Sequence, residues 1–431
     1  MNDQPANQPI STVDHKRHAA FFRQSGWMMF AAIAGGAMTF GVHFLNKKIP
    51  DAEYAIFGTL LMMTACIPTM PLQMVFAQQT AQALATNRER QLAGMIRLAW
   101  LWTFVLWAVG ALLVFAFQGA IVQSWKLPNA VALWVTLFVV LASLWTPLFA
   151  GVLQGRQDFF WFGWAMMSGG IVRLVVAAAA VLFFAGKNAT GLMIGTLAGV
   201  GLGVVIFTWR SRDLLWMRPE KFDVKNSLGQ MLPLMLGFGA CQFLFTTDTM
   251  FAKAYFSGDE MKPYVAAGTL SRALLWLVLP LASVMFPKIV HSSAKAEKTN
   301  LFNIVVLGTA VLAVCGAIGL WLVGPLVVKI VYKSGDVAKT VALLPWYAGA
   351  MIPLALANVI VNDLLARSRF KIVPFMVVLV VIYAFALPQM MNRFPGRLEV
   401  VLQTLGVFNL LLFAICAWFA WVKKDGAAET K

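Results

Sequence analysis

Charged residues are scarce in this chain of 431 residues: Asp, Glu, Lys and Arg make up only 12% of it, and 60% is hydrophobic. A soluble domain is typically about 25% charged and about 45–50% apolar. A water-soluble fold with this composition would have to expose much of its apolar surface to water, so the composition excludes an ordinary soluble protein. It predicts an all-helical protein that crosses a membrane many times.

Motifs for catalysis and nucleotide binding are also missing. The sequence contains no G-x-x-x-x-G-K-[ST] loop, no H-E-x-x-H and no G-x-S-x-G. Its cysteines lie inside apolar segments, with spacings that suit neither a metal site nor an external disulfide framework, so buried thiols are expected. We therefore expect a protein that is not an enzyme and that needs no cofactor or metal. The four cysteines are Cys66, Cys241, Cys315 and Cys416.

Long apolar segments are abundant. A helix of about 20 residues crosses the hydrocarbon core of a bilayer, which is roughly 30 Å thick. The first such segment ends in Asn46-Lys47-Lys48 without a small-residue cleavage site, which indicates a retained helix and not a signal peptide. Twelve spans are expected, at residues 27–45, 54–83, 93–118, 130–153, 159–185, 189–209, 229–256, 264–290, 301–323, 340–364, 371–391 and 398–422.

The formal net charge of +16 is unevenly distributed. With twelve spans, both termini and the even-numbered connections share one side of the membrane, and that side carries most of the Lys and Arg residues. Because cytoplasmic loops collect positive charge, both termini are expected in the cytoplasm. The expected location is the inner (cytoplasmic) membrane of the cell. The basicity then reflects topology and contact with anionic membrane lipids, not nucleic-acid binding.

One connection divides the chain into halves. The charged segment 210–228 is the longest expected link, and it separates an N-lobe of six spans, residues 27–209, from a C-lobe of six spans, residues 229–422. Residues 1–26 and 423–431 are expected as cytoplasmic tails. Because six is even, both halves enter the membrane in the same direction, which predicts parallel repeats.

Two sequence echoes support a duplication. Tyr54-Ala-Ile-Phe-Gly58-Thr59-Leu60 returns 210 positions later as Tyr264-Val-Ala-Ala-Gly268-Thr269-Leu270. Leu153-Gln-Gly-Arg156 after the fourth span returns 211 positions later as Leu364-Leu-Ala-Arg367 after the tenth. An internally duplicated membrane protein usually transports something.

Glycine and proline mark particular spans. Glycines spaced four apart lie on one face of the sixth span, where helix backbones can approach closely; tight packing is favoured over a moving part. Prolines in the second and eighth spans fit either helices that bend during transport or ordinary kinks. The residues are Gly191, Gly195, Gly199, Gly203, Pro68, Pro71, Pro280 and Pro287.

Three charged residues interrupt apolar spans, where a charge costs at least about 2.5–3.5 kcal/mol. Asp248 in the seventh span and Arg272 in the eighth lie equally far from the hairpin centred near Glu260, so helical rise places them at the same depth. They are expected to face each other, either as a structural ion pair or as part of a substrate or ion pathway.

The third charge, Arg173, lies deep in the fifth span with no acidic residue near it in sequence. A watery cavity with an anionic ligand explains it best, because guanidinium binds phosphate well; the alternative is bonding to backbone carbonyls. Arg23, at the inner end of the first span, faces either such a cavity or a lipid head group. The repeat-equivalent positions of the three span charges are uncharged, at Met38, Met62 and Ala384, so the duplication does not extend to the charges.

Taken together, this pattern resembles the multidrug/oligosaccharidyl-lipid/polysaccharide (MOP) exporter superfamily, and within it the O-antigen-type oligosaccharide flippases of bacterial polysaccharide biosynthesis. The resemblance implies a two-lobe architecture like that of MATE transporters, with alternating access to a central cavity. It implies that a polyprenyl-diphosphate-linked oligosaccharide moves from the cytoplasmic to the outer leaflet, its diphosphate held by Arg173, Arg272 and Arg23. The likeness is carried by Leu153-Gln-Gly-Arg156-Gln, Asp248, Tyr264-Val-Ala-Ala-Gly268 and Phe286-Pro287-Lys288.

Some features depart from branches of that superfamily. Drug exporters often carry an acidic residue in the first span, and residues 27–45 contain none. Lipid II flippases tend to have further C-terminal spans, whereas this chain ends soon after its twelfth. Alternatives are a cation-coupled exporter that uses Asp248, a glycan polymerase or ligase, which would need a long external loop, and an assembly scaffold. Glycan polymerases are also possible partners of a flippase.

Overall fold

A computed structural model describes residues 10–65, 67, 69–124, 130–183, 189–256, 258–294, 301–331 and 337–422. The described chain is helical throughout, and eleven helical segments are long and apolar enough to cross a membrane. The predicted all-helical, polytopic fold is therefore confirmed. The longer helices are α1 (Ile10–Gly41), α2 (Asp51–Ala65), α3 (Thr69–Ala85), α4 (Glu89–Ala116), α6 (Ala130–Gly155), α7 (Phe159–Leu182), α8 (Ala189–Arg210), α10 (Val224–Tyr255), α11 (Gly258–Ala294), α12 (Leu301–Val331), α13 (Val337–Ala366), α14 (Val373–Arg393) and α15 (Leu398–Ala417).

Short elements complete the chain. The first helix starts at Ile10, so much of the segment expected as an N-terminal tail is helical. The remaining elements are η1 (Val42–Lys48), α5 (Gln118–Ser124), α9 (Arg212–Trp216), η2 (Phe370–Ile372) and a π-helical turn, η3 (Trp418–Val422).

The second expected span, residues 54–83, is not one helix. It is divided into α2, which ends at Ala65, and α3, which begins at Thr69; Pro68 lies outside the described residues. Pro71 lies in the first turn of α3, where proline is tolerated. The eighth span behaves differently, because α11 runs without a break through Pro263, Pro280 and Pro287.

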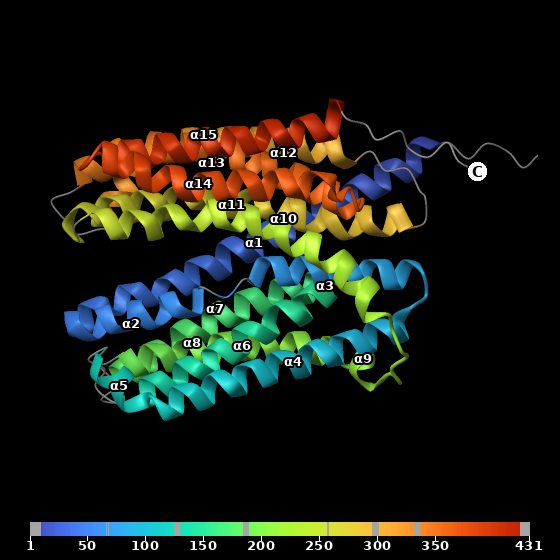
Figure 1. The fold of residues 1–431 in the computed structure, drawn as a ribbon, viewed down its shortest axis with the longest axis horizontal. Helices are drawn as coiled ribbons and strands as arrows, with labels where there is room; N and C mark the ends of the chain where they lie inside the picture. The colour runs from blue at the N-terminus through green and yellow to red at the C-terminus, as the bar shows by residue number, and fades with distance from the viewer. Residues whose placement is uncertain are drawn as a thin grey trace, which may run out of the picture.

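The helices form two groups, shown as the blue-to-green and yellow-to-red halves of Figure 1. In the first group α7 packs on α1 and α8, and α6 packs on α3 and α8. In the second, α13 packs on α11, α12 and α15. Several helices contact the other group: α1 runs diagonally between the groups and contacts α11, α3 contacts α10 and α11, and α6 contacts α11.

The two groups share a turn of the same backbone geometry. Gln157, in the turn between α6 and α7, has φ 60°, and Ser368, 211 positions later, has φ 57°. In the first turn Asp158 N donates to Leu153 O at 2.9 Å, and in the second Arg369 N donates to Leu364 O at 2.9 Å. The echo that begins at these two leucines thus corresponds to a repeated helix-ending turn with one left-handed residue.

The segment that connects the groups is fastened to the first of them. Arg156 Nη1 donates to Asp213 Oδ1 at 2.8 Å, and Arg210 Nη2 pairs with Asp158 Oδ2 at 2.8 Å, so two residues of the α6–α7 turn hold the end of α8 and the start of α9. Partial burial would raise the pKa of Asp213, but the hydrogen bonds and charge of Arg156 outweigh it and lower that pKa. The carboxylate therefore stays ionised at neutral pH.

The groups meet near one end of the bundle, which we call the base: the end where α1 begins and η3 ends, at the right of Figure 1. Gln78 Nε2, on α3, donates to Leu365 O of α13 at 3.2 Å. Gln154 Nε2, on α6, donates to Ser283 O of α11 at 3.0 Å. Gln154 and Leu365 lie in the last turns of α6 and α13, so these bonds join the two groups toward the base.

The glycine stripe on α8 packs closely against α7. A Cβ on Gly199 would lie 2.5 Å from Gly169 O and 2.7 Å from Arg173 Cβ, and a Cβ on Gly195 would lie 2.8 Å from Arg173 O. Gly203, by contrast, has no atom within 4 Å of such a Cβ. The predicted close packing is therefore confirmed at two of the four glycines, and those two support the backbone of Arg173.

Gly199→Ala is expected to lower the free energy of unfolding by about 1–3 kcal/mol, because the added methyl must push α7 away from α8. Gly203→Ala is the matched control on the same helix, and we expect it to be neutral or slightly stabilising. Denaturation by SDS in mixed micelles measures both. Equal effects of the two substitutions would contradict the packing role of Gly199.

Candidate functional site

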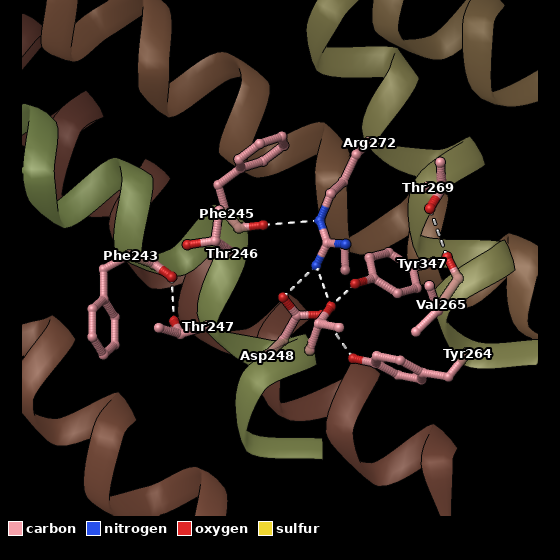
Figure 2. Close-up of polar contacts among 12 residues, drawn as sticks. Phe243, Phe245, Thr246, Thr247, Asp248, Tyr264, Val265, Thr269, Arg272 and Tyr347 are labelled. Carbon is pink, nitrogen blue, oxygen red and sulfur yellow. Dashed lines mark hydrogen bonds and ion pairs between the residues drawn. The ribbon is translucent and has the colours of Figure 1, made fainter. Parts of the chain in front are cut away.

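Asp248 of α10 is the most deeply buried acidic residue that the sequence singled out, with an exposed fraction of 0%. Arg272 of α11 lies against it, with Nη2 2.6 Å from Asp248 Oδ1 (Figure 2). The side chain of Arg272 is 14% exposed. The juxtaposition expected from their equal depth is therefore present, and it cancels two buried charges.

Further contacts hold the guanidinium of Arg272 in place. Its Nε donates to Phe245 O at 2.9 Å, and its Nη2 also donates to Thr249 Oγ1 at 2.8 Å. The guanidinium carbon lies 5.3 Å from the ring centre of Tyr347. Arg272 thus has partners for its charge and for several of its donors, all of them in the second helix group.

Two tyrosines complete the environment of Asp248. Tyr264 Oη donates to Asp248 Oδ2 at 2.8 Å, and Tyr347 Oη donates to the same oxygen (Figure 2). Tyr347 needs the small residue opposite it, because a Cβ on Gly268 would lie 2.9 Å from its Oη. Both carboxylate oxygens therefore have donors, and in this conformation Asp248 is a fully bonded anion.

Arg173 of α7 has a different environment, although it too is buried, with an exposed fraction of 9%. Its Nε and Nη2 atoms are buried without a hydrogen-bond partner. Burying donors unpaired is costly, and for a charged group the cost is larger. Among the described residues, Arg173 is the arginine with two buried, unsatisfied donors.

Arg23 of α1 is exposed. Arg23 and Arg173 lie on α1 and α7 of the first helix group, and Arg272 lies on α11 of the second. Their availability to an anionic ligand differs: Arg173 has unsatisfied donors, Arg272 is neutralised by Asp248, and Arg23 lies at the surface.

The architecture matches that of known transporters. A MATE transporter in complex with MaL6 has a TM-score of 0.75 and 12% identity, over 93% of this chain and 95% of that one. A mutant of the Vibrio cholerae MATE transporter VcmN has a TM-score of 0.72 and 15% identity, over 94% and 95%. An outward-facing multidrug resistance MATE transporter of the MOP superfamily has a TM-score of 0.72 and 11% identity, over 93% and 94%. At such identities the likeness shows the fold alone, and no curated protein matches the sequence.

The sequence itself matches a family model over nearly its full length: that of the lipid II flippase MurJ covers residues 30–425. The chain belongs to the MurJ family. It is therefore a flippase-type transporter of the MOP superfamily and not an enzyme. The predicted superfamily is confirmed, although the number of spans had pointed away from the lipid II branch. Placement among the O-antigen-type flippases stays a prediction.

Several features of this MurJ-family protein were not found from its sequence. Tyr347 was not singled out, and Tyr264 was noticed only as part of a repeated and family-like segment, not as a partner of Asp248. Tyr383 belongs with these two tyrosines. Its hydroxyl is buried without a hydrogen-bond partner and lies close enough to Asp248 to interact with its charge. The only available signal was rarity, since the chain has six tyrosines.

The remaining expectations for the MurJ-family chain have mixed outcomes. Asp363 Oδ1 and Arg367 Nε, four positions apart, form an ion pair at 3.0 Å. Cys241 and Cys416 are buried thiols, but Cys315 is exposed on α12, and Cys66 lies outside the described residues. Across the described ranges no cluster of His, Cys, Asp and Glu suited to a metal ion is found.

Proposed function

We propose that this MurJ-family protein moves a polyprenyl-diphosphate-linked oligosaccharide from the cytoplasmic to the outer leaflet of the inner membrane, for surface polysaccharide or lipopolysaccharide biosynthesis. The anionic diphosphate and its sugars would pass between the two helix groups while the prenyl chain stays in lipid. Membrane lipids and, on the outer side, a glycan polymerase are the partners that such a substrate implies.

The unpaired guanidinium of Arg173 carries this proposal. A buried cation with unsatisfied Nε and Nη2 atoms gains most from a ligand that offers two acceptor oxygens to adjacent donors. Phosphate and diphosphate groups have this geometry, whereas neutral and cationic drugs do not. Arg173 would therefore bind the diphosphate during transport.

Arg272 and Asp248 have a supporting role in the proposal. Because the pair is closed and both tyrosines donate to Asp248, we assign it to shaping the second helix group in this conformation. Arg23, an exposed cation on α1, would meet the arriving head group. The expected order of importance for substrate binding is Arg173 first and Arg23 second.

The conformation fits alternating access. If the positive-inside distribution places the base in the cytoplasm, the glutamine bonds at the base close the cytoplasmic side. The described state would then be the one from which substrate leaves toward the outer leaflet. Transport requires these contacts to open and re-form.

Drug export is the competing function within the same fold. The MATE likeness supports the architecture only, and no acidic residue falls within residues 27–45, where ion-coupled exporters often have one. A cation-coupled exporter would have to use Asp248, whose two oxygens already have donors. We therefore place export second.

Reconstituted proteoliposomes test the proposal. Undecaprenyl-diphosphate-linked oligosaccharide would be incorporated in one leaflet, and its arrival in the other leaflet would be followed with a membrane-impermeant sugar-modifying enzyme. We expect flipping at least about tenfold faster than for a neutral polyprenyl glycoside with the same sugar, because charge-assisted bonds discriminate by this factor or more. Lipid II in a third arm separates the two flippase branches. Equal flipping of the neutral and the diphosphate lipid would contradict the proposal.

A further inference from the structure

A third contact closes the base, and it differs from the glutamine bonds in being made by a cation. Lys288 Nζ of α11 lies 5.4 Å from the ring centre of Phe21 of α1. Phe21 is fully buried, and Lys288 is half-buried between the two helix groups. Among the ion pairs of the described residues none involves Lys288. The partner that the structure shows for its ammonium charge is the ring of Phe21.

Several polar side chains of α1 and α3 are incompletely bonded. On the first helix group, Gln78 Oε1, Gln79 Nε2 and Ser25 Oγ are buried without partners. Such groups are better satisfied by water, so they favour separation of the two groups at the base. The cation–π contact joins the groups beside a shared apolar core, in which Phe76 and Phe286 are buried, and it is a contact that a competing anion can remove.

From this geometry we infer that Lys288 is the first phosphate-binding residue at the base, and that an anionic lipid head group releases it from Phe21. This inference rests on the proposed function, since it assigns the site where the diphosphate is received. A cation–π contact is weaker than a charge-assisted hydrogen bond to phosphate oxygen. A phosphate that arrives at the base therefore competes successfully for the ammonium group, and the loss of the Phe21 contact favours the open base.

Lys288 and Arg173 then have successive roles. Lys288 lies in the second helix group near the base, and Arg173 lies well inside α7 of the first group. Binding at Lys288 opens the base, and Arg173 receives the diphosphate deeper in the membrane. The ammonium group can bind any phosphate, so recognition at Lys288 depends on charge and not on the sugar.

A cysteine at position 283 would report opening. Ser283 contributes its backbone oxygen to the closure, so Ser283→Cys leaves the bond from Gln154 possible. In a background with the four native cysteines replaced, the rate of labelling by a water-soluble maleimide would be measured in nanodiscs. The added probes are undecaprenyl diphosphate, undecaprenol, which has no phosphate, and inorganic pyrophosphate, which separates a lipid head group from a free phosphate.

We expect undecaprenyl diphosphate, but not undecaprenol, to raise the labelling rate about fivefold or more in the reporter protein. Lys288→Met, which keeps the aliphatic stem, should reduce this response to less than about twofold, and Lys288→Arg should preserve it. Phe21→Leu should raise the rate without any probe, because the ring that holds Lys288 is gone. A response to pyrophosphate as well would support head-group recognition without the lipid chain.

Two results would overturn the inference: a full response to undecaprenyl diphosphate in Lys288→Met, or no response in any variant. The flipping assay distinguishes these from a failure of the proposed function. Normal flipping with either result leaves the flippase intact and removes only the role of Lys288. Phosphate-independent flipping in the wild-type protein removes both.

Discussion

Arg173→Leu is expected to lower the rate of diphosphate-lipid flipping at least about tenfold, because a charge-assisted contact to phosphate is worth roughly 1.5–3 kcal/mol. The same substitution should leave the free energy of unfolding unchanged or raise it, since it removes a buried cation whose Nε and Nη2 atoms have no partner. Loss of activity without loss of stability is the signature of a ligand-binding residue. Flipping in proteoliposomes and SDS denaturation measure the two quantities on the same preparation.

Two variants serve as controls for Arg173→Leu. Arg173→Lys keeps the charge but loses the planar pair of donors, so an intermediate rate is expected. Arg23→Leu removes an exposed cation and should have a smaller effect on flipping. If Arg173→Leu flipped normally, or if its stability fell by several kcal/mol, the arginine would be a structural residue bonded to protein, as the alternative interpretation of the sequence allowed.

Asp248→Asn is expected to lower the free energy of unfolding by about 3–5 kcal/mol, because it leaves Arg272 as an uncompensated buried charge. Asparagine also turns an amide N–H₂ toward one carboxylate position, and in one orientation it meets the hydroxyls of Tyr264 and Tyr347. Denaturation by SDS measures the loss. Tyr347→Phe removes one donor to Asp248 and should cost less, about 1–2 kcal/mol.

The double variant Asp248→Asn/Arg272→Gln decides what the pair is for. Without either charge, much of the lost stability should return, since replacing a whole buried pair is far less costly than breaking it. A stable double variant that still flips substrate would identify a structural pair. A stable double variant that does not flip would show that Asp248 or Arg272 takes part in transport, which is the second interpretation drawn from the sequence.

The sequence predicted the fold well because membrane helices are specified by local composition. Apolar length gave the approximate position of most spans, although eleven helical segments of the described residues, and not the expected twelve, are long and apolar enough to cross a membrane. The sequence also predicted that Asp248 and Arg272 lie at the same depth, since both are on helices that leave the same hairpin. The division of the second span at Ala65 was not predicted, because residues 54–83 are apolar enough for one helix and composition does not register a local break.

The surroundings of the charges could not be predicted in this way. Tyr347 is 99 positions from Asp248, and the sequence around neither residue predicts the contact. Likewise, whether an arginine in a span is paired depends on tertiary neighbours: Arg272 has a carboxylate partner and Arg173 has two unsatisfied nitrogens, although both stand in apolar sequence. The structure therefore changed the ranking of the candidates more than it changed their number.

The fastening of the connecting segment has a mechanical consequence. Beyond α9, Glu220 N donates to Arg90 O at 3.2 Å, and Phe222 packs over Gly94, so the chain is still attached to α4 at residue 222. Helix α10 starts at Val224, which leaves a tether too short to let its first turn move away from α4, because an extended residue spans at most about 3.6 Å. The two halves of the molecule can then swing about this edge but cannot part along it. Opening of the base must be a hinge motion that is widest on the side away from α4. A lipid head group would then enter from that side.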